Sequence, residues 1–229
     1  MKLKETSSPV VLGIFLALVG AIAALILAMS DNVTREPIKA NSRKNMVKAL
    51  RDVLPPFANQ PDGQIVTVQS EDQVEVKFYA GKDESGKITG IAAETVSGKG
   101  YAGKIKVMTG FFPDGKVRSV LVTEQNETPG LGTVVCQRKN VVKLSDLLTG
   151  KKAEAGLPKN PILDQFSGHS AAPDDTWKRP WAVKKDGGPV EYMTGATITS
   201  RAVTEAVDRA AATLLARRDE IMRNFNGSK

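Results

Sequence analysis

The sequence predicts an α+β fold that is preceded by a membrane-spanning helix. The first supporting observation is an apolar run without charges over residues 9–29. The second is an alternation of apolar and polar residues in the middle of the chain, with turn signals between the runs, which is typical of an antiparallel sheet. The third is helical periodicity near both ends of the chain. Helices and strands are therefore segregated rather than alternating, which favours α+β over α/β.

Composition limits the possible functions. The 229 residues are 41% hydrophobic, enough for a packed core, and carry a formal charge of +7. The basic residues are scattered and form no stripe, so we expect no nucleic-acid partner, whereas contact with anionic lipid fits the charge. One cysteine, Cys136, and one histidine, His169, exclude an intrachain disulfide and a Cys/His metal cluster. Any redox chemistry must therefore come from an organic cofactor.

Residues 9–29 are long enough to cross a bilayer, since 21 residues of α-helix span about 31 Å. Lys2 and Lys4 precede this run and Asp31 follows it. The positive-inside rule then predicts a single pass through the cell (inner) membrane, with residues 1–8 cytoplasmic and the main domain extracytoplasmic, or periplasmic. A cleavable signal peptide ending near Ala28-Met29-Ser30 is the alternative.

Helical periodicity resumes from Pro37 to Leu54, and Pro55-Pro56 ends it. We therefore expect a linker helix within residues 30–56 and a folded domain over residues 57–229. The basic residues on the polar face of the linker are best explained as a solvated surface.

The middle of the domain is expected to form an antiparallel sheet. Val74, Val76 and Phe78 alternate with polar residues, and Pro113-Asp114-Gly115-Lys116 is a strong hairpin signal. The expected strands are, in chain order, residues 74–78, 88–95, 105–112, 117–123 and a final strand at 190–193.

Between the last two strands the chain is expected to be loop-rich. Residues 138–165 contain one short apolar piece at Leu144, Leu147 and Leu148. His169 is expected to be a surface or partly packed residue, and Trp177 and Trp181 to be core anchors rather than electron relays. Cys136 is expected to be a small buried residue.

Residues 191–203 are the most informative stretch. Four hydroxyl side chains lie within seven positions, at Thr194, Thr197, Thr199 and Ser200, and Gly195-Ala196 between them leaves the backbone accessible. A helical pattern of about six turns follows, with its apolar face at Val203, Val207, Ala210, Leu214 and Ile221. The hydroxyl cluster therefore lies at a helix N-terminus, which favours an anion such as phosphate.

From the residues alone, two other interpretations of this cluster stay open. Thr199 or Ser200 is a helix N-cap within an ordinary turn. Alternatively, Thr197 or Ser200 is the nucleophile of a hydrolase, which requires a base, and His169 is the one histidine available.

The segment Thr194-Gly195-Ala196-Thr197 resembles the flavinylation motif of FMN-binding domains, Asp-x-x-(Ser/Thr)-Gly-Ala-Thr, with Glu191 in place of the leading Asp. The longer string Thr-Gly-Ala-Thr-Ile-Thr-Ser-x-Ala-Val is similar to the G subunit of Rnf-type electron-transport complexes and to the related C subunit of the sodium-pumping NADH:quinone reductase. The resemblance implies FMN bound covalently through a phosphoester to Thr197, with Thr194, Gly195, Ala196 and Thr199 around it.

Two further segments match the same family. Glu127-Thr128-Pro129-Gly130-Leu131-Gly132 is alone only a turn signal, with Gly130 in the left-handed region. The resemblance places this string beside the isoalloxazine and so implies contacts from Glu127, Thr128, Gly130, Leu131 and Gly132. The glycine-rich segment 97–104 reads alone as a flexible surface turn, and the resemblance adds Tyr101 as a contact.

The resemblance implies a membrane-anchored flavoprotein subunit that relays electrons within an Rnf-type ion-translocating ferredoxin:NAD oxidoreductase. It is expected to carry electrons without catalytic or metal-binding residues of its own, and no Gly-x-Gly-x-x-Gly fingerprint for NAD is present. The expected partners are the other membrane and redox subunits, a flavin transferase for maturation, and membrane lipid. The alternatives are the C subunit of the quinone reductase and a non-redox, membrane-anchored interaction module.

Overall fold

The computed structural model describes residues 9–138, 157–173 and 175–227. The expected cytoplasmic segment 1–8 and the apolar piece at residues 144–148 lie outside the described residues. The chain divides into two units, residues 1–45 and residues 46–229, and each is described by itself.

The first unit is formed by most of helix α1, Pro9–Val53. The described part of the chain contains one helix long and apolar enough to cross a membrane, and it is this one. The sequence indicated two helical segments, but α1 continues through residues 30–36 and through Pro37. The Arg35–Asp31 ion pair of 2.7 Å, one helical turn apart, supports the helix between the two segments.

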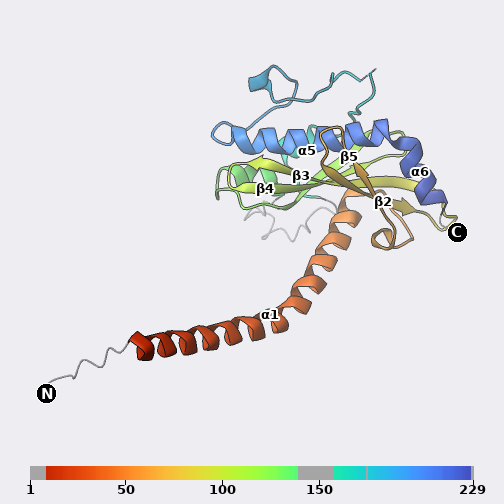
Figure 1. Cartoon of the computed structure of the whole chain (residues 1–229). Coiled ribbons are helices and arrows are strands. Elements are labelled where there is room, and N and C mark those ends of the chain that lie inside the picture. The colour runs from red at the N-terminus through yellow and green to blue at the C-terminus, as the bar shows by residue number, and fades with distance from the viewer. Residues whose placement is uncertain (1–8, 139–156, 174, 228–229) are drawn as a thin grey trace, which may run out of the picture. The chain divides into compact units, whose positions relative to one another are not determined.

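The second unit contains a five-stranded antiparallel sheet in the order β1-β2-β3-β4-β5 (Figure 1). This arrangement, with helices outside the sheet, confirms the α+β prediction. Strand β1 was not anticipated. The strands are β1 Ile65–Gln69, β2 Glu75–Lys82, β3 Ile88–Gly100, β4 Gly103–Phe111 and β5 Val117–Glu124.

The strand expected at residues 190–193 is wrong. Val190 forms only an isolated parallel bridge with Val183, and the following residues are irregular. The main-chain groups of Glu191 pair instead with the side chain of Gln165, at 2.7 and 3.0 Å. Backbone groups that find side-chain partners need no neighbouring strand.

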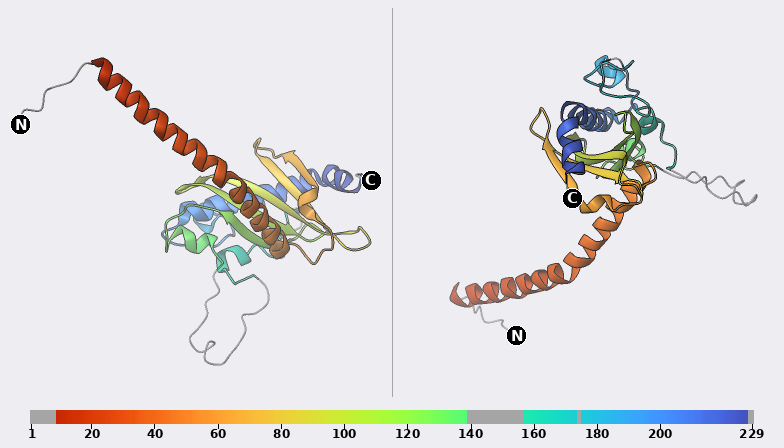
Figure 2. Two further views of the ribbon diagram at one scale, coloured as in Figure 1. Left: turned by 90° about the horizontal axis from the view of Figure 1, so that it is seen from below. Right: turned by 90° about the vertical axis from the view of Figure 1, so that its right-hand side faces the viewer.

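Helix α5, Thr197–Ala216, covers one face of the sheet, as Figures 1 and 2 show. Its predicted apolar face is confirmed, because Val203, Val207, Ala210 and Leu214 are all buried in the main core. The Thr95 hydroxyl of β3 donates to the carbonyl of Ala206 at 3.1 Å. This long-range hydrogen bond between strand and helix therefore fixes the position of α5 along the sheet, in addition to the apolar packing.

The last turns of α1 cover the other face, where Leu50, Val53 and Leu54 pack with Tyr79, Ala92 and Met108. Gly110 allows this approach, since a Cβ built on it would lie 2.1 Å from the carbonyl oxygen of Val53. The end of the helix is also bonded to β5: Arg118 and Ser119 donate to the carbonyls of Asp52 and Val53 at 3.0 and 3.3 Å.

The C-terminal helical pattern is broken into two helices. Helix α5 ends at Ala216 and α6 covers Arg218–Asn226, with Arg217 between them at φ −116° and ψ 19°. The break directs Ile221 and Phe225 into the core. The carbonyl of Phe225 then accepts a hydrogen bond of 2.7 Å from Lys82 at the end of β2.

The aromatic residues before α5 form one cluster. Trp181 is buried, and the Trp177 and Phe166 rings meet edge to face with centroids 5.9 Å apart, so both tryptophans anchor packing as predicted. His169 is partly packed, with its ring stacked on Trp177 at 3.9 Å and its Nδ1 2.9 Å from the Asp175 carboxylate.

Candidate functional site

The N-terminus of α5 is open. The helix begins at Thr197, and its N-cap is Ala196, which has no side-chain capping bond. The interpretation of Thr199 or Ser200 as the N-cap is therefore wrong, because both lie inside the first turn. The first main-chain bond runs from the amide of Ser200 to the carbonyl of Ala196 at 3.0 Å. Within the described residues no side chain caps the amides at this helix start, which suits an incoming anion.

The four hydroxyls of the cluster fall into two pairs. Thr199 and Ser200 are buried and bonded inside the protein: Thr199 donates to Glu127 Oε2 at 2.5 Å, and Ser200 donates to the carbonyl of Ala196 at 3.0 Å. Thr194 is exposed and Thr197 is half-buried. Within the described residues, the hydroxyls of Thr194 and Thr197 make no hydrogen bond.

The same contacts leave no support for a hydrolase nucleophile. The ring of His169 is engaged by Asp175 and Trp177. In the described part of the chain it bonds to neither Thr197 nor Ser200. A nucleophile requires a base within hydrogen-bond reach.

The turn before α5 brings bare backbone to the surface. Gly195 has φ of +87°, a conformation that a residue with a side chain rarely adopts. The amide of Ala196 bonds to the carbonyl of Met193 at 3.0 Å, and Ser200 Oγ accepts from the amide of Met193 at 3.3 Å. A Cβ on Gly195 would lie 3.5 Å from a methyl of Leu131. Two predicted cofactor segments therefore meet at Gly195 and Leu131.

The segment 127–132 forms a tight turn that leads into helix α2, Gly132–Cys136. Gly130 has φ of +77°, so the predicted left-handed glycine is confirmed. Its amide bonds to Thr133 Oγ1 at 2.9 Å, and the amide of Leu131 bonds to the carbonyl of Thr128 at 3.2 Å. The side chains of Thr128 and Leu131 are left exposed to solvent.

Most of the glycine-rich segment 97–104 lies in two strands, and residues 101 and 102 form an exposed turn between them. Strand β3 continues to Gly100 and β4 begins at Gly103, so the segment is the tip of a hairpin. The amide of Ala102 in this tip bonds to Glu127 Oε1 at 3.1 Å. Tyr101 beside it is 69% exposed. The third predicted cofactor segment is thus joined to the second through Glu127.

Glu191 lies at the position of the motif's leading acid. Its carboxylate pairs with Lys184 of the 3-10 helix η2, Lys184–Asp186. Asp186 of the same short helix forms a bidentate pair with Arg201 of α5, at 2.5 and 2.6 Å. Both ion pairs are exposed, so each contributes little to the stability of the fold.

Two residues whose side chains bond to the main chain near the site were not identified from the sequence. The buried side chain of Asn160 donates to the carbonyls of Val134, Val135 and Gln137 at 3.0 to 3.1 Å, closing the C-terminal end of α2. Its oxygen caps helix α4, Pro161–Asp164. Arg138 donates to the carbonyl of Val120 at 2.9 and 3.0 Å and to Asp164 at 2.6 Å. An Asn before a Pro was the available sequence signal, since it is typical of a helix start.

Cys136 is buried, as predicted. Burial, followed by the nearby Glu127 carboxylate, raises the pKa of the thiol to about 12, so it stays protonated at neutral pH. Among the described residues no group of three or more His, Cys, Asp or Glu side chains is arranged to hold a metal ion.

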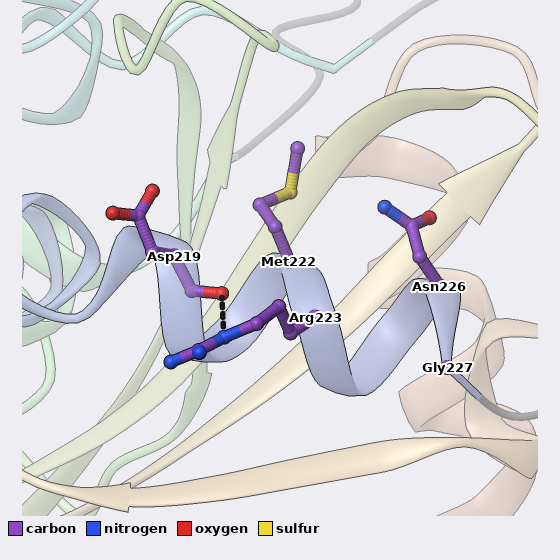
Figure 3. Close-up of a pocket in the computed structure, with 5 residues that line it drawn as sticks. All are labelled: Asp219, Met222, Arg223, Asn226 and Gly227. Atoms are coloured by element: carbon purple, nitrogen blue, oxygen red, sulfur yellow. Dashed lines mark hydrogen bonds between the residues drawn. The ribbon is translucent and has the colours of Figure 1, made fainter.

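A hollow of about 700 Å³ lies along α6 and is lined by Asp219, Met222, Arg223, Asn226 and Gly227 (Figure 3). In it Arg223 Nε donates to the carbonyl of Asp219 at 3.3 Å, and Met222 and Asn226 extend from the helix. No predicted cofactor residue lines this hollow. The site is instead a surface formed by the hairpin tip, the 127–132 turn and the start of α5.

Comparison with known proteins places these segments in one domain. Residues 100–212 match the family model of the FMN-binding domain, so Tyr101, the 127–132 turn and Thr197 all fall inside it.

Curated relatives extend the similarity to most of the chain. The G subunit of the ion-translocating oxidoreductase complex of Cereibacter sphaeroides is 33% identical over 205 residues, covering 89% of this chain and 83% of the relative. The corresponding G subunit of Vibrio cholerae is 31% identical over 204 residues, covering 86% of each. The crystal structure of NqrC from Shewanella oneidensis matches with a TM-score of 0.40 and 19% identity, over 77% of this chain and 71% of that one. The chain belongs to the family of G subunits of ion-translocating oxidoreductase complexes and, through its FMN-binding domain, is a flavoprotein of that family.

Proposed function

We propose that this chain carries FMN joined through its phosphate to the hydroxyl of Thr197, and that it relays electrons within an Rnf-type ion-translocating ferredoxin:NAD oxidoreductase. The observation that supports the attachment is the state of that hydroxyl. Thr197 is the first residue of α5, is half-buried, and has no hydrogen-bond partner among the described residues. Of the two unbonded hydroxyls in the cluster, it is the one at the helix terminus.

The residues present fit a flavin mononucleotide. The phosphate would lie at the uncapped start of α5, where main-chain amides and the helix dipole favour an anion. Gly195 leaves room for the ribityl chain, and the exposed side chains of Tyr101 and Leu131 offer apolar surface to the ring. Thr128 and the main chain of Gly130 and Gly132 complete the contacts we propose.

The flavin supplies the redox chemistry, since it takes up one or two electrons. The side chains of this domain bind and orient it and set the local charge. No catalytic or metal-binding residue is needed for this role. The relatives are by name subunits of a complex, so we propose the other membrane and redox subunits as electron donor and acceptor. A flavin transferase installs the cofactor.

We propose that residues 9–29 of α1 cross the cell membrane once. Lys2 and Lys4 before the span keep the N-terminus in the cytoplasm, which puts residues 57–229 on the outer side. The lipid chains would cover the apolar side chains of α1, which are exposed along its first half. Accessibility of an engineered cysteine in the domain to an impermeant reagent on intact cells tests this orientation.

Flavin fluorescence in a denaturing gel tests the attachment. The full chain is co-expressed with a flavin transferase, and the band should fluoresce and carry the mass of FMN less water. Thr197→Ala should abolish both signals, whereas Thr194→Ala, which removes the other unbonded hydroxyl, should keep the covalent signal. A fluorescent band in Thr197→Ala, or an unmodified Thr197 peptide in protein from the native host, contradicts the proposal.

A further inference from the structure

The carboxylate of Glu127 is the buried centre of the three cofactor segments. It is 4% exposed and accepts hydrogen bonds from the amide of Ala102 at 3.1 Å and from the hydroxyl of Thr199 at 2.5 Å. The two donors belong to the hairpin tip and to the first turn of α5. Within the described residues no lysine or arginine forms an ion pair with Glu127.

At two glycines the backbone lies very close to this carboxylate. A Cβ on Gly132 would lie 2.6 Å from Glu127 Oε2 and 2.8 Å from Thr199 Oγ1. A Cβ on Gly100 would lie 2.8 Å from Glu127 Oε1. Contacts this short leave no space for a side chain at either position, so the enclosure depends on both glycines.

The contacts alone do not require an acid. A glutamine has the same shape, and it would accept from Ala102 through its oxygen and donate to Thr199 Oγ1 through its nitrogen. Burying a carboxylate without a cation costs more free energy than burying an amide. An acid at this position therefore indicates that the negative charge itself has a use.

The groups around Glu127 adjoin the residues of the proposed FMN site. Ala102 follows Tyr101, Gly132 follows Leu131, and Thr199 lies two residues after Thr197. The side chains of Tyr101 and Leu131 are exposed while Glu127 is buried, so the carboxylate lies beneath the surface that these residues form.

On the basis of the proposed function, we propose that Glu127 is a positioning residue with two effects on the bound flavin. It holds the hairpin tip, the 127–132 turn and the start of α5 in fixed relation, and its negative charge beneath the ring lowers the reduction potential of the flavin. The sign follows from electrostatics. Reduction adds negative charge to the flavin, and a fixed negative charge nearby in a partly desolvated site opposes that addition.

The experiment uses the full chain, loaded with FMN by a co-expressed transferase and purified in detergent. Glu127→Gln should keep covalent FMN and a melting temperature at least as high as that of the wild type, while the potential in a spectroelectrochemical titration moves to a more positive value. Thr199→Val keeps the acid and removes one donor, so the potential should change less and the flavin fluorescence anisotropy should fall. Glu124→Gln is the matched control, since this acid is exposed and pairs with Lys106, and it should change neither reading.

An unchanged potential in Glu127→Gln contradicts the role of the charge, and unchanged anisotropy in Thr199→Val contradicts the role of the bonds. If Glu127→Gln does not fold, Glu127→Asp is measured instead, because it keeps the charge and has a shorter side chain. Its anisotropy should fall, and a wild-type value again contradicts the bonds. Thr197→Ala separates the two proposals. A covalent flavin in that variant overturns the attachment to Thr197. If Thr197→Ala loses the covalent flavin but the Glu127 variants keep the wild-type potential and anisotropy, only the inference about Glu127 is overturned.

Discussion

The Thr199 hydroxyl donates a hydrogen bond of 2.5 Å to the carboxylate of Glu127, across 72 residues of sequence. Both side chains are buried, so water does not readily replace either partner. The bond joins the start of α5 to the 127–132 turn. These are two of the segments whose sequences resemble the same family, and the bond brings them into one site. Four sets of variants can test the contacts of this site, of two buried strand residues and of one partly exposed ion pair.

Gly132→Ala should destabilise the protein and disturb the site, because the added Cβ meets Glu127 Oε2 at 2.6 Å. Overpacking of this kind costs about 1–3 kcal/mol. The measurement is thermal unfolding of the full chain, together with FMN content. Gly98→Ala is the control, since a Cβ there meets nothing within 4 Å. Equal melting temperatures for the two variants would show that the enclosure around Glu127 is loose.

Thr128→Ala should shift the reduction potential of the bound flavin or increase its mobility, without changing protein stability. The hydroxyl of Thr128 is exposed and makes no hydrogen bond within the described residues, so the fold does not depend on it. Visible spectra, anisotropy and potentiometry on the loaded protein are the measurements. Wild-type values in all three would remove the Thr128 side chain from the site.

Thr109→Val and Thr95→Val should differ in their effect on stability, although both residues are fully buried in neighbouring strands. Thr95 Oγ1 donates to the carbonyl of Ala206, so its loss should cost about 1 kcal/mol. Thr109 Oγ1 has no hydrogen-bond partner among the described residues, so valine should leave stability unchanged or raise it. Chemical denaturation of both variants makes the comparison, and a large loss in Thr109→Val would reveal a buried water at that hydroxyl.

Asp72→Asn should reduce stability at neutral pH by no more than about 1 kcal/mol, because the pair with Arg209 is partly solvated. The bond from Arg209 holds the pKa of Asp72 below its usual value of 3.8. A lowered pKa means that the stabilisation is present above pH 3.8 and is lost as the pH falls through the folded-state value. Wild type and variant should therefore differ at pH 7 and converge below pH 3.8. A difference that persists in acid would point to a contact other than the charge.

Much of the fold was predictable because its local patterns are strong. The apolar face of α5 and the hairpin at residues 113–116 depend on neighbours in sequence, and both are present. The strand expected at 190–193 failed because its main-chain partners come from Gln165, a side chain that no periodicity identifies. The hydroxyl cluster lies at the start of a helix as predicted, but the N-cap is Ala196 and not Thr199 or Ser200, which the sequence left open as an alternative.

The segments of the candidate site were predictable from the sequence, but the hydrogen bonds that join them were not. The motifs indicated which residues gather, and they resembled one family in the right order. The resemblance gave Glu127 as a cofactor contact, but its bonds to Ala102 and Thr199 span 25 and 72 residues, which sequence spacing does not reveal. Asn160 and Arg138 were missed for the same reason, since each acts on carbonyls about twenty residues away.

If FMN is attached to Thr197 as proposed, the unequal burial of the four neighbouring hydroxyls favours attachment after folding. An unfolded chain would present Thr194, Thr197, Thr199 and Ser200 alike to a modifying enzyme, whereas the native chain withholds the last two. Regioselectivity is then partly a property of the acceptor protein. Acquisition of the prosthetic group would accordingly come after folding, and a misfolded copy would be poorly or promiscuously labelled.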